Sequence, residues 1–235
     1  MDVVRGLDAL PLPDGPSAVT VGFFDGVHLG HQEVIRRTVE AAKERDARSV
    51  AVTFDRHPRE ILTPGEEPRL LTTVERKAEL IAACGIDALV VLEFTQRFSQ
   101  VGAEDFVRDV LVGGLRAVHA RVGADFRFGH RAAGTVVTLR EVGGPLGMTA
   151  DEVGLFAIDG RVVSSSSIRE ALAAGASAGV SAWFLRDVVR PGNGLLQRAN
   201  VTIPLAFMAR LALRMVRERT RPAGDRTISE VGSVS

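Results

Sequence analysis

Apolar runs that predict strands alternate with segments of helical spacing along most of the chain. Continuous apolarity predicts strands buried on both faces, and it occurs at 18–24, 49–54, 87–93 and 117–122. Apolar or small residues at helical spacing predict helices over about 31–45, 72–84, 102–112 and 135–142. A strand over 152–158 and a helix over 168–172 complete the pattern. This alternation indicates an α/β fold with a parallel sheet that helices cover on both faces.

Local signals mark where these elements begin and end. Thr72 and Glu75 have the spacing of a capping box, and the serines at 164–167 can cap the helix that follows them. The segment 55–71 holds three prolines and predicts a long loop, which in a compact domain is usually functional or disordered. Ligands of parallel α/β sheets bind beyond the carboxyl ends of the strands. The loops that follow the strands, together with the serine run, are therefore the candidate binding segments.

Residues 17–32 form the most informative stretch of the sequence. The first strand stops at the turn signal Asp25-Gly26, and His28 and His31 follow at a helix start with Gly30 between them. A strand, a turn and a helix start place backbone N–H groups and imidazoles around one point. A phosphate is well held at such a point.

Three interpretations of His28 and His31 are open. As metal ligands they would need a third partner; Asp25, His57 and His130 are available, but no familiar metal spacing links them. As structural residues they would only begin the helix. In nucleotidyl transfer, the imidazoles would stabilise the charge that builds on the α-phosphate as pyrophosphate departs. We favour this third interpretation over metal binding.

The serine run supports the same interpretation. Four serines, 164–167, lie between Arg161 and Arg169 and directly before a clear helix. Alone, the run could be a flexible loop or a redundant helix cap. Hydroxyl groups, a helix N-terminus and an arginine fork together make a polyphosphate site. Combined with the two histidines, the run becomes a strong signal of a nucleoside triphosphate.

Composition and charge exclude several classes of protein. The 235 residues are 46% apolar and carry a formal net charge of zero, so there is no global electrostatic case for nucleic acid or for a membrane surface. Cys84 is the only cysteine, which excludes a disulfide and a cysteine-based zinc site. No apolar stretch reaches membrane-spanning length, and the N-terminus does not resemble a signal peptide. We expect no integral membrane association and a cytoplasmic protein.

Four motifs, GFFDGVHLGHQ, TFDRHP, VGADFRFG and RVVSSSSIREAL, resemble in order and spacing those of the bacterial bifunctional riboflavin kinase/FAD synthetase family. The resemblance covers roughly residues 1–185, the FMN adenylyltransferase module. It implies a Rossmann-like, doubly wound parallel sheet of the H-x-G-H nucleotidyltransferase type. It also implies transfer of AMP from Mg-ATP to the phosphate of FMN, with FAD and pyrophosphate as products. Mg²⁺ would be held mainly by the ATP phosphates, without a dedicated set of protein ligands.

The resemblance assigns roles to residues of this chain. The catalytic residues would be His28, His31, Ser165 and Arg169. The ATP-binding residues would be Gly22, Phe23, Asp25, Gly30, Asp125, Arg161, Ser164 and Ser166. The FMN-binding residues would be Phe54, Arg56, His57, Pro58 and Phe128. Phe128, in a glycine-bounded loop, is the stronger candidate for contact with the flavin ring, because Phe54 is nearly as well explained as a core strand residue.

Two departures from the family pattern stand out. Arg56 replaces a usual proline and would either bind the FMN phosphate or disturb the flavin pocket. A riboflavin kinase module would need more residues than 186–235 provide, and its motifs are not visible, so we predict that kinase activity is absent. Instead, 204–219 predicts an amphipathic helix that packs on the domain or mediates self-association, and 220–235 predicts a disordered tail.

Two alternative functions remain open. Arg56 and Leu62 in the acceptor loop are compatible with a nucleotidyltransferase that uses another phosphorylated acceptor. The short C-terminal part is compatible with a catalytically weak regulatory protein that binds flavin or nucleotide. The presence of both histidines, Asp125, the serines and Arg169 in one chain argues against the regulator.

Overall fold

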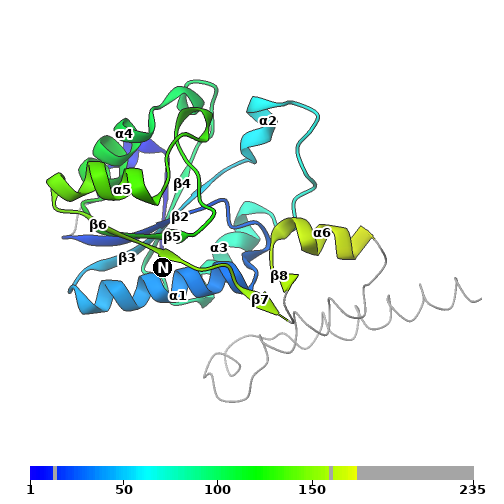
Figure 1. Ribbon diagram of the computed structural model, residues 1–235, viewed down its shortest axis with the longest axis horizontal. Helices are drawn as coiled ribbons and strands as arrows, with labels where there is room; N and C mark the ends of the chain where they lie inside the picture. The colour runs from blue at the N-terminus through cyan, green and yellow to red at the C-terminus, as the bar shows by residue number, and fades with distance from the viewer. Residues whose placement is uncertain (13–14, 159–160, 174–235) are drawn as a thin grey trace, which may run out of the picture. The chain divides into compact units, whose positions relative to one another are not determined.

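A computed structural model describes residues 1–12, 15–158 and 161–173 of the chain. Six strands form one parallel sheet in the order β1-β4-β3-β2-β5-β6 (Figure 1). Their bounds are β1 (Asp2–Arg5), β2 (Ser17–Val21), β3 (Arg48–Phe54), β4 (Ala88–Leu92), β5 (Ala117–Gly123) and β6 (Thr149–Val153). The predicted α/β fold with a parallel sheet is confirmed.

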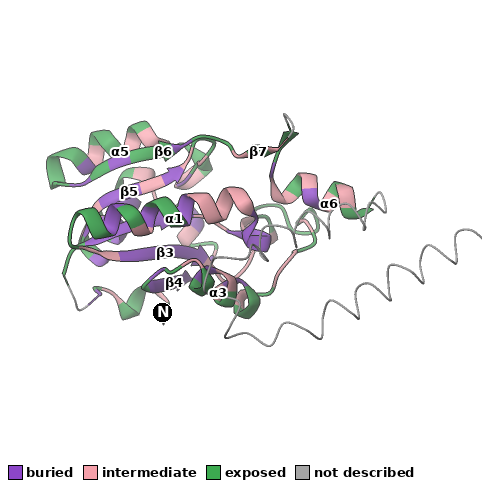
Figure 2. Cartoon of the chain, turned by 90° about the horizontal axis from the view of Figure 1, so that it is seen from below, coloured by how far each residue is buried: buried purple, intermediate pink, exposed green. Residues whose placement is uncertain are grey.

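Helices cover both faces of this sheet. On one face lie α1 (Leu29–Glu44) and α3 (Val74–Ala83), and on the other lie α4 (Ala103–Asp105), its π-helical continuation η4 (Phe106–Gly114) and α5 (Val136–Gly143) (Figure 1). Each face of the sheet has its own apolar core. Ile35 and Ile81 pack with Leu89 in the core of the first face, and Leu111 and Leu139 belong to the core of the second face. The buried strands and the half-buried helix α1 are visible in Figure 2.

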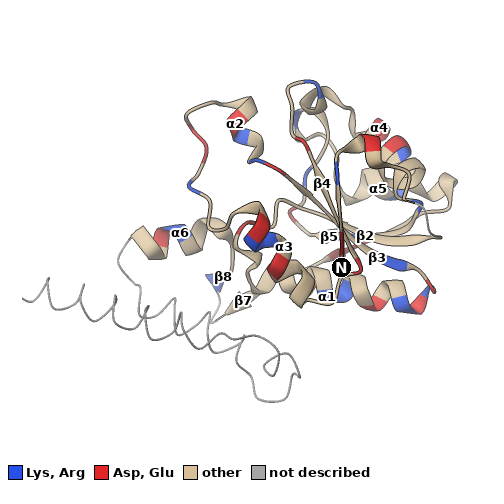
Figure 3. Ribbon diagram, turned by 180° about the vertical axis from the view of Figure 1, so that it is seen from behind, with Lys and Arg blue, Asp and Glu red and all other residues tan. Residues whose placement is uncertain are grey.

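The remaining described elements are short, apart from α6 (Ser165–Ala173). They are α2 (Pro58–Leu62), the antiparallel pair β7 (Ala157–Ile158) and β8 (Arg161–Val162), and the single-turn segments η1 (Leu7–Ala9), η2 (Asp25–Val27), η3 (Phe98–Gln100), η5 (His130–Ala132) and η6 (Gly144–Leu146). Charged side chains lie mainly on helices and loops, and β2 and β4 carry none (Figure 3).

The position of β2 determines where a ligand can bind. From β2 the chain builds outward through β3 and β4 on one side, and later through β5 and β6 on the other. The connections leave β2 and β5 in opposite directions, and parallel α/β sheets generally form their ligand-binding crevice beyond the carboxyl ends of two such neighbouring strands. The turn after β2 and the loop after β5 border that crevice.

Two predicted strands have different limits in the structure. The strand predicted over 18–24 ends at Val21, because Phe24 turns into the left-handed region at φ 53°. The strand predicted over 152–158 is wrong: β6 covers Thr149–Val153, and Ala157–Ile158 belongs to a separate hairpin. As an edge strand, β6 buries only Ala150 and Val153, so its first half lacks the apolar run that marks the inner strands.

Other local expectations are also corrected. The segment 55–71 is not all loop, since it contains α2. The cap of α3 is Thr73, whose side chain accepts a hydrogen bond from the N–H of Arg76, rather than Thr72. The helix predicted over 102–112 continues to Gly114 as a π-helix. The edge strand β1 was not predicted, because only four mostly exposed residues form it.

Several expectations concern residues outside the described part of the chain. These are the domain boundary at 185, the amphipathic helix at 204–219 with its self-association, and the disordered tail at 220–235. Among the helices that the structure describes, none is both long and apolar enough to cross a bilayer.

Candidate active site

The turn after β2 is strained and closely packed. Phe24 at φ 53° and Val27 at φ 40° both occupy the left-handed region, which is costly for residues with a side chain. Gly22 is required beside Phe24, because a Cβ on residue 22 would lie 2.8 Å from the Phe24 ring. The burial of Phe24 and Val27 offsets this strain and keeps the chain on the path to the start of α1.

His28 and His31 form a stacked pair at the end of this turn. Their ring centroids are 3.6 Å apart with an interplanar angle of 22°, and His28 is the N-cap residue of α1. Gly30 leaves room for the pair, since a Cβ there would lie 3.3 Å from the His28 ring. The Nδ1 atoms of both histidines are buried and have no hydrogen-bond partner among the described residues. Such unpaired buried nitrogens are uncommon in folded proteins and mark the pair as a candidate functional element.

Burial keeps both imidazoles of the pair neutral. Burial lowers the pKa of His28 to about 4, although Asp25 and Asp125 oppose that shift. Burial also lowers the pKa of His31 well below its ordinary value, and the neighbouring His28 and Lys77 lower it further. Both rings are thus neutral at pH 7. Each neutral ring can donate one N–H, beside the free N–H groups of the first turn of α1, and such a set of donors is suited to an anion.

Asp25, in the turn after β2, connects this turn to residues 71–72 and to α6 through hydrogen bonds and an ion pair. Its buried carboxylate accepts hydrogen bonds from the N–H groups of Leu71, at 2.8 Å, and Thr72, at 3.1 Å. The other carboxylate oxygen binds the guanidinium of Arg169 at 2.9 Å, and the Asp25 carbonyl accepts a hydrogen bond from the Ser165 hydroxyl. The resemblance assigned Asp25 to ATP binding and Arg169 to catalysis, and the structure brings the two side chains into direct contact.

The serine run begins α6 as predicted. The Ser164 hydroxyl accepts a hydrogen bond from the N–H of Ser167 and caps the helix, while the Ser167 hydroxyl accepts one from the N–H of Ser164. Ser166 is exposed and accepts a weak hydrogen bond from Arg169 at 3.3 Å. Arg161 lies exposed on β8. Through Ser165 and Arg169, the serine run and the turn after β2 form one site.

The loop after β5 contributes Asp125 to the same region. Asp125 is exposed, follows the carboxyl end of β5 and raises the pKa of His28, which places its charge near the histidine pair. Among the described residues, no group of three or more His, Cys, Asp and Glu side chains could hold a metal ion.

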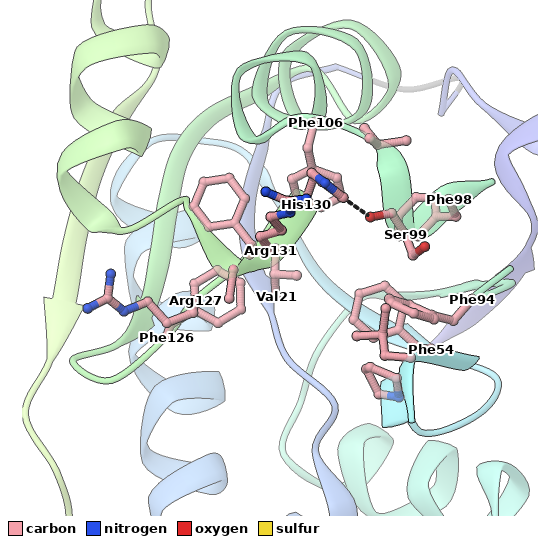
Figure 4. Close-up of a pocket in the computed structure, with 16 residues that line it drawn as sticks. Val21, Phe54, Phe94, Phe98, Ser99, Phe106, Phe126, Arg127, His130 and Arg131 are labelled. Atoms are coloured by element: carbon pink, nitrogen blue, oxygen red, sulfur yellow. Dashed lines mark hydrogen bonds between the residues drawn. The ribbon is translucent and has the colours of Figure 1, made fainter. Parts of the chain in front are cut away.

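An aromatic cavity of about 300 Å³ opens beside this site (Figure 4). Its lining is mostly apolar and includes six phenylalanines, with Arg127, His130 and Arg131 as basic groups. The phenylalanines are Phe54, Phe94, Phe98, Phe106, Phe126 and Phe128. Phe54 and Phe94 meet edge to face at 5.4 Å, and Phe126 stacks on Phe128 at 5.5 Å. Such a lining favours a flat aromatic ligand.

Loop 129–132 forms one wall of the cavity. His130 is held by the carbonyl oxygen of Ser99 at 3.1 Å, and because a carbonyl only accepts, Nδ1 carries the hydrogen (Figure 4). Arg131 at φ 53° and Ala132 at φ 55° are strained. The guanidinium of Arg127 points away from the labelled rings (Figure 4). The loop is therefore fixed by its own contacts before any ligand arrives.

The residues predicted for FMN divide into two groups. Phe54, Pro58 and Phe128 line the cavity, whereas Arg56 and His57 lie outside the set of described residues that line it. Arg56 binds its neighbour Asp55 at 2.8 Å. His57 caps α2, since its Nδ1 accepts a hydrogen bond from the N–H of Arg59, and its ring contacts the edge of Phe23 at 4.8 Å.

Sequence reasoning missed five residues of this region: Phe94, Phe98, Phe106, Phe126 and Lys77. The four phenylalanines come from three separate segments, and only a parallel sheet brings those segments together. One signal was available for Lys77, because it lies four residues before Ile81 on the buried face of α3.

The chain matches the FAD synthetase family over residues 12–167. It is 38% identical over 174 residues to a bifunctional riboflavin kinase/FMN adenylyltransferase of Pseudomonas fluorescens, which covers 74% of this chain and 56% of the relative. It is 32% identical over 174 residues to the protein of the same description from Escherichia coli (strain K12), with the same coverage of 74% and 56%. The chain spans about half the length of the curated relatives it matches.

A solved structure is also similar. The crystal structure described as a macrolide-efflux protein from Streptococcus pneumoniae superposes with a TM-score of 0.62 at 24% identity, over 72% of this chain and 56% of that one. At this identity the similarity concerns the fold alone.

Proposed function

Because this chain belongs to the FAD synthetase family, we propose that it is an FMN adenylyltransferase, which transfers AMP from ATP to the phosphate of FMN. One observation carries the proposal. Val21, the last residue of β2, lines the aromatic cavity, and the next residue, Gly22, begins the turn that leads to His28 and His31. A flat aromatic ring and a phosphate can therefore be held on the two sides of one strand end.

The chemistry of FMN suits both halves of the site. Its tricyclic ring matches a cavity walled by phenylalanines, where ring stacking contributes to binding. Its phosphate extends from the ring on a polar chain and would lie toward the histidine pair. The cavity supports this orientation through its apolar wall, which would take the ring; Arg127, His130 and Arg131 are the basic residues of the lining, and the phosphate would extend past them toward the histidine pair.

The reaction needs little proton transfer from the protein. At pH 7 a phosphate monoester is mostly a dianion, so the attacking FMN oxygen has no proton to lose. That oxygen forms a bond to the α-phosphorus of ATP, and the bond from the α-phosphorus to the bridging oxygen of the β-phosphate breaks. The electron pair leaves with pyrophosphate. Donors that are already oriented around the α-phosphate stabilise the charge that develops.

We assign these donors to His28, His31 and the first turn of α1. Their neutral, unpaired rings support this role. Arg169 and the hydroxyls of Ser165 and Ser166 would hold the departing phosphates. Mg²⁺ would arrive on ATP as part of the substrate, with Asp125 as the nearby carboxylate.

A paired assay tests the proposal. The 235-residue protein is incubated with Mg-ATP and either FMN or riboflavin, and the flavins are separated by chromatography. We expect FAD from FMN and no FMN from riboflavin, because the kinase motifs are not visible after residue 185. Absence of FAD from FMN would overturn the proposal. Pyrophosphate release with another phosphorylated acceptor alone would favour the other transferase, and tight FMN binding without turnover would favour the regulator.

A further inference from the structure

Lys77 is a cation buried between the two halves of the candidate site. It lies in α3, its side chain is 1% exposed, and it is among the largest fully buried side chains described. Its ammonium nitrogen lies 3.9 Å from the centre of the Phe23 ring. Its polar partners are weak: the Thr53 hydroxyl at 3.3 Å and the Phe54 carbonyl at 3.5 Å.

These contacts connect Lys77 both to the turn that leads to the histidine pair and to the wall of the aromatic cavity. The Thr53 hydroxyl donates a hydrogen bond to the carbonyl of Phe23 at 3.0 Å, so Lys77 supports Phe23 through its ring and through its main chain. Phe23 belongs to the turn that leads to the histidine pair. Phe54, whose carbonyl Lys77 also contacts, is a wall of the aromatic cavity. One ammonium group thus contacts the turn and the cavity wall at once.

The charge of Lys77 is costly to the fold. It forms no salt bridge among the described residues, and burial lowers its pKa to about 8, although Asp25 and Asp55 oppose that shift. Replacement of a buried ion pair by apolar side chains of similar size is often neutral or stabilising, and a buried charge without an opposite charge is more costly still. A purely structural explanation therefore does not account for a lysine here.

We propose that Lys77 is a positioning residue for adenylyl transfer, whose ammonium group fixes Phe23 and so sets the turn bearing His28 and His31 relative to the Phe54 wall. The inference rests on the proposed function. The charged or titratable groups that face Lys77 are Asp25 in the turn, Asp55 after β3 and His31 on α1. None of them replaces its contact with the Phe23 ring.

The test uses Lys77→Met, Lys77→Arg and a matched control, Lys43→Met, which removes the other lysine of the chain from an exposed site on α1. We expect Lys77→Met to lower kcat for FAD formation by on the order of 10-fold to 30-fold, the scale of a desolvated cation–π contact. Its midpoint of thermal unfolding should be equal to that of the wild type or higher. Lys43→Met should change neither quantity.

The pH profile separates positioning from packing. In the wild type, kcat should fall above about pH 8 as Lys77 loses its proton. Lys77→Arg keeps its charge in that range, so this decline should disappear, and it should also be absent from the slow Lys77→Met variant. A Lys77→Met enzyme with wild-type kcat and the same alkaline decline would overturn the proposal, as would a loss of stability large enough to explain the loss of rate.

A binding measurement keeps the two proposals distinguishable. The affinities of each variant for ATP and for FMN are measured by calorimetry, and each is repeated with the other ligand present, using the non-hydrolysable α,β-methylene analogue of ATP. We expect Lys77→Met to weaken the effect of one ligand on the other. If the wild type makes no FAD, the proposed function fails, and unchanged coupling in Lys77→Met then overturns the Lys77 proposal as well.

Discussion

The guanidinium of Arg169 binds the carboxylate of Asp25 at 2.9 Å and joins residues that are 144 positions apart in the chain. This ion pair holds α6 against the turn after β2, with help from the hydrogen bond between the Ser165 hydroxyl and the Asp25 carbonyl. Arg169 is therefore oriented before any nucleotide binds. Under the proposed function, an incoming phosphate would meet a guanidinium already in place rather than a free side chain.

Asp25→Asn should destabilise the protein by about 1–3 kcal/mol, because an amide keeps the bonds from Leu71 and Thr72 but leaves Arg169 without its counter-charge. Urea unfolding measures the change. The matched control is Glu104→Gln, which removes an exposed ion pair with Arg108 and should cost less than about 0.5 kcal/mol. Equal losses in the two variants would contradict a central role for the Asp25–Arg169 pair.

His31→Ala should lower kcat for FAD formation by roughly 10²–10³-fold, the scale of one lost charge-stabilising donor. Steady-state assays at saturating ATP and FMN measure it. Because the two rings stack at 3.6 Å, the effects of His28→Ala and His31→Ala should not add in the double variant. Wild-type turnover in His31→Ala would remove that histidine from the mechanism.

Phe126→Ala should raise the KM for FMN by about tenfold while the KM for ATP stays unchanged, because Phe126 stacks on Phe128 in the cavity wall. Val137→Ala, at an exposed position on α5, is the control and should leave both constants as they are. An equal rise in both KM values after Phe126→Ala would indicate a general disturbance of the fold.

The free energy of unfolding should fall as the pH drops from about 6.5 to about 4. Burial lowers the pKa of His28 and of His119 to about 4, and it lowers those of His31 and His57. Below pH 6.5 the unfolded chain binds protons that these folded histidines do not, so acid favours unfolding.

Urea titrations at several pH values measure this slope, and His119→Gln should make it shallower. His119 is fully buried and bonded to the Thr149 hydroxyl at 2.8 Å, and it lies on β5. A glutamine keeps a polar group there without titrating. An unchanged slope in this variant would exclude His119 as a source of the acid sensitivity.

The sequence predicted strands and helix caps correctly where a local pattern of residues determines the structure. Continuous apolarity marked the four inner strands, and the serines before Ile168 predicted the cap that Ser164 forms. It was less informative at edges and turns. β1 and β6 bury too few residues to give a pattern, and no local rule predicts that Phe24 adopts a left-handed conformation, because that depends on packing against Gly22 and His31.

The candidate site shows the same division. The half that we propose to bind phosphate lies in two contiguous motifs. His28, His31, Ser165 and Arg169 could therefore be named from the sequence, and the structure joins the two motifs through Asp25. The aromatic half is assembled from distant segments, and Phe94 and Phe106 meet there only after the sheet has formed. For Lys77 the helical spacing to Ile81 indicates a position on the buried face of α3, but its contact with the Phe23 ring becomes evident only in the folded structure.

The adjacency of Val21 and Gly22 has a consequence for which acceptors the protein can use. Since one strand end borders the ring cavity and the next residue starts the phosphate turn, the gap between ring and phosphate is set by the rigid centre of the sheet. The proposed site would therefore select acceptors by the length of the linker between their ring and their phosphate. Compounds with the right ring but a shorter or longer linker would occupy the cavity and still fail to bring their phosphate to the histidines.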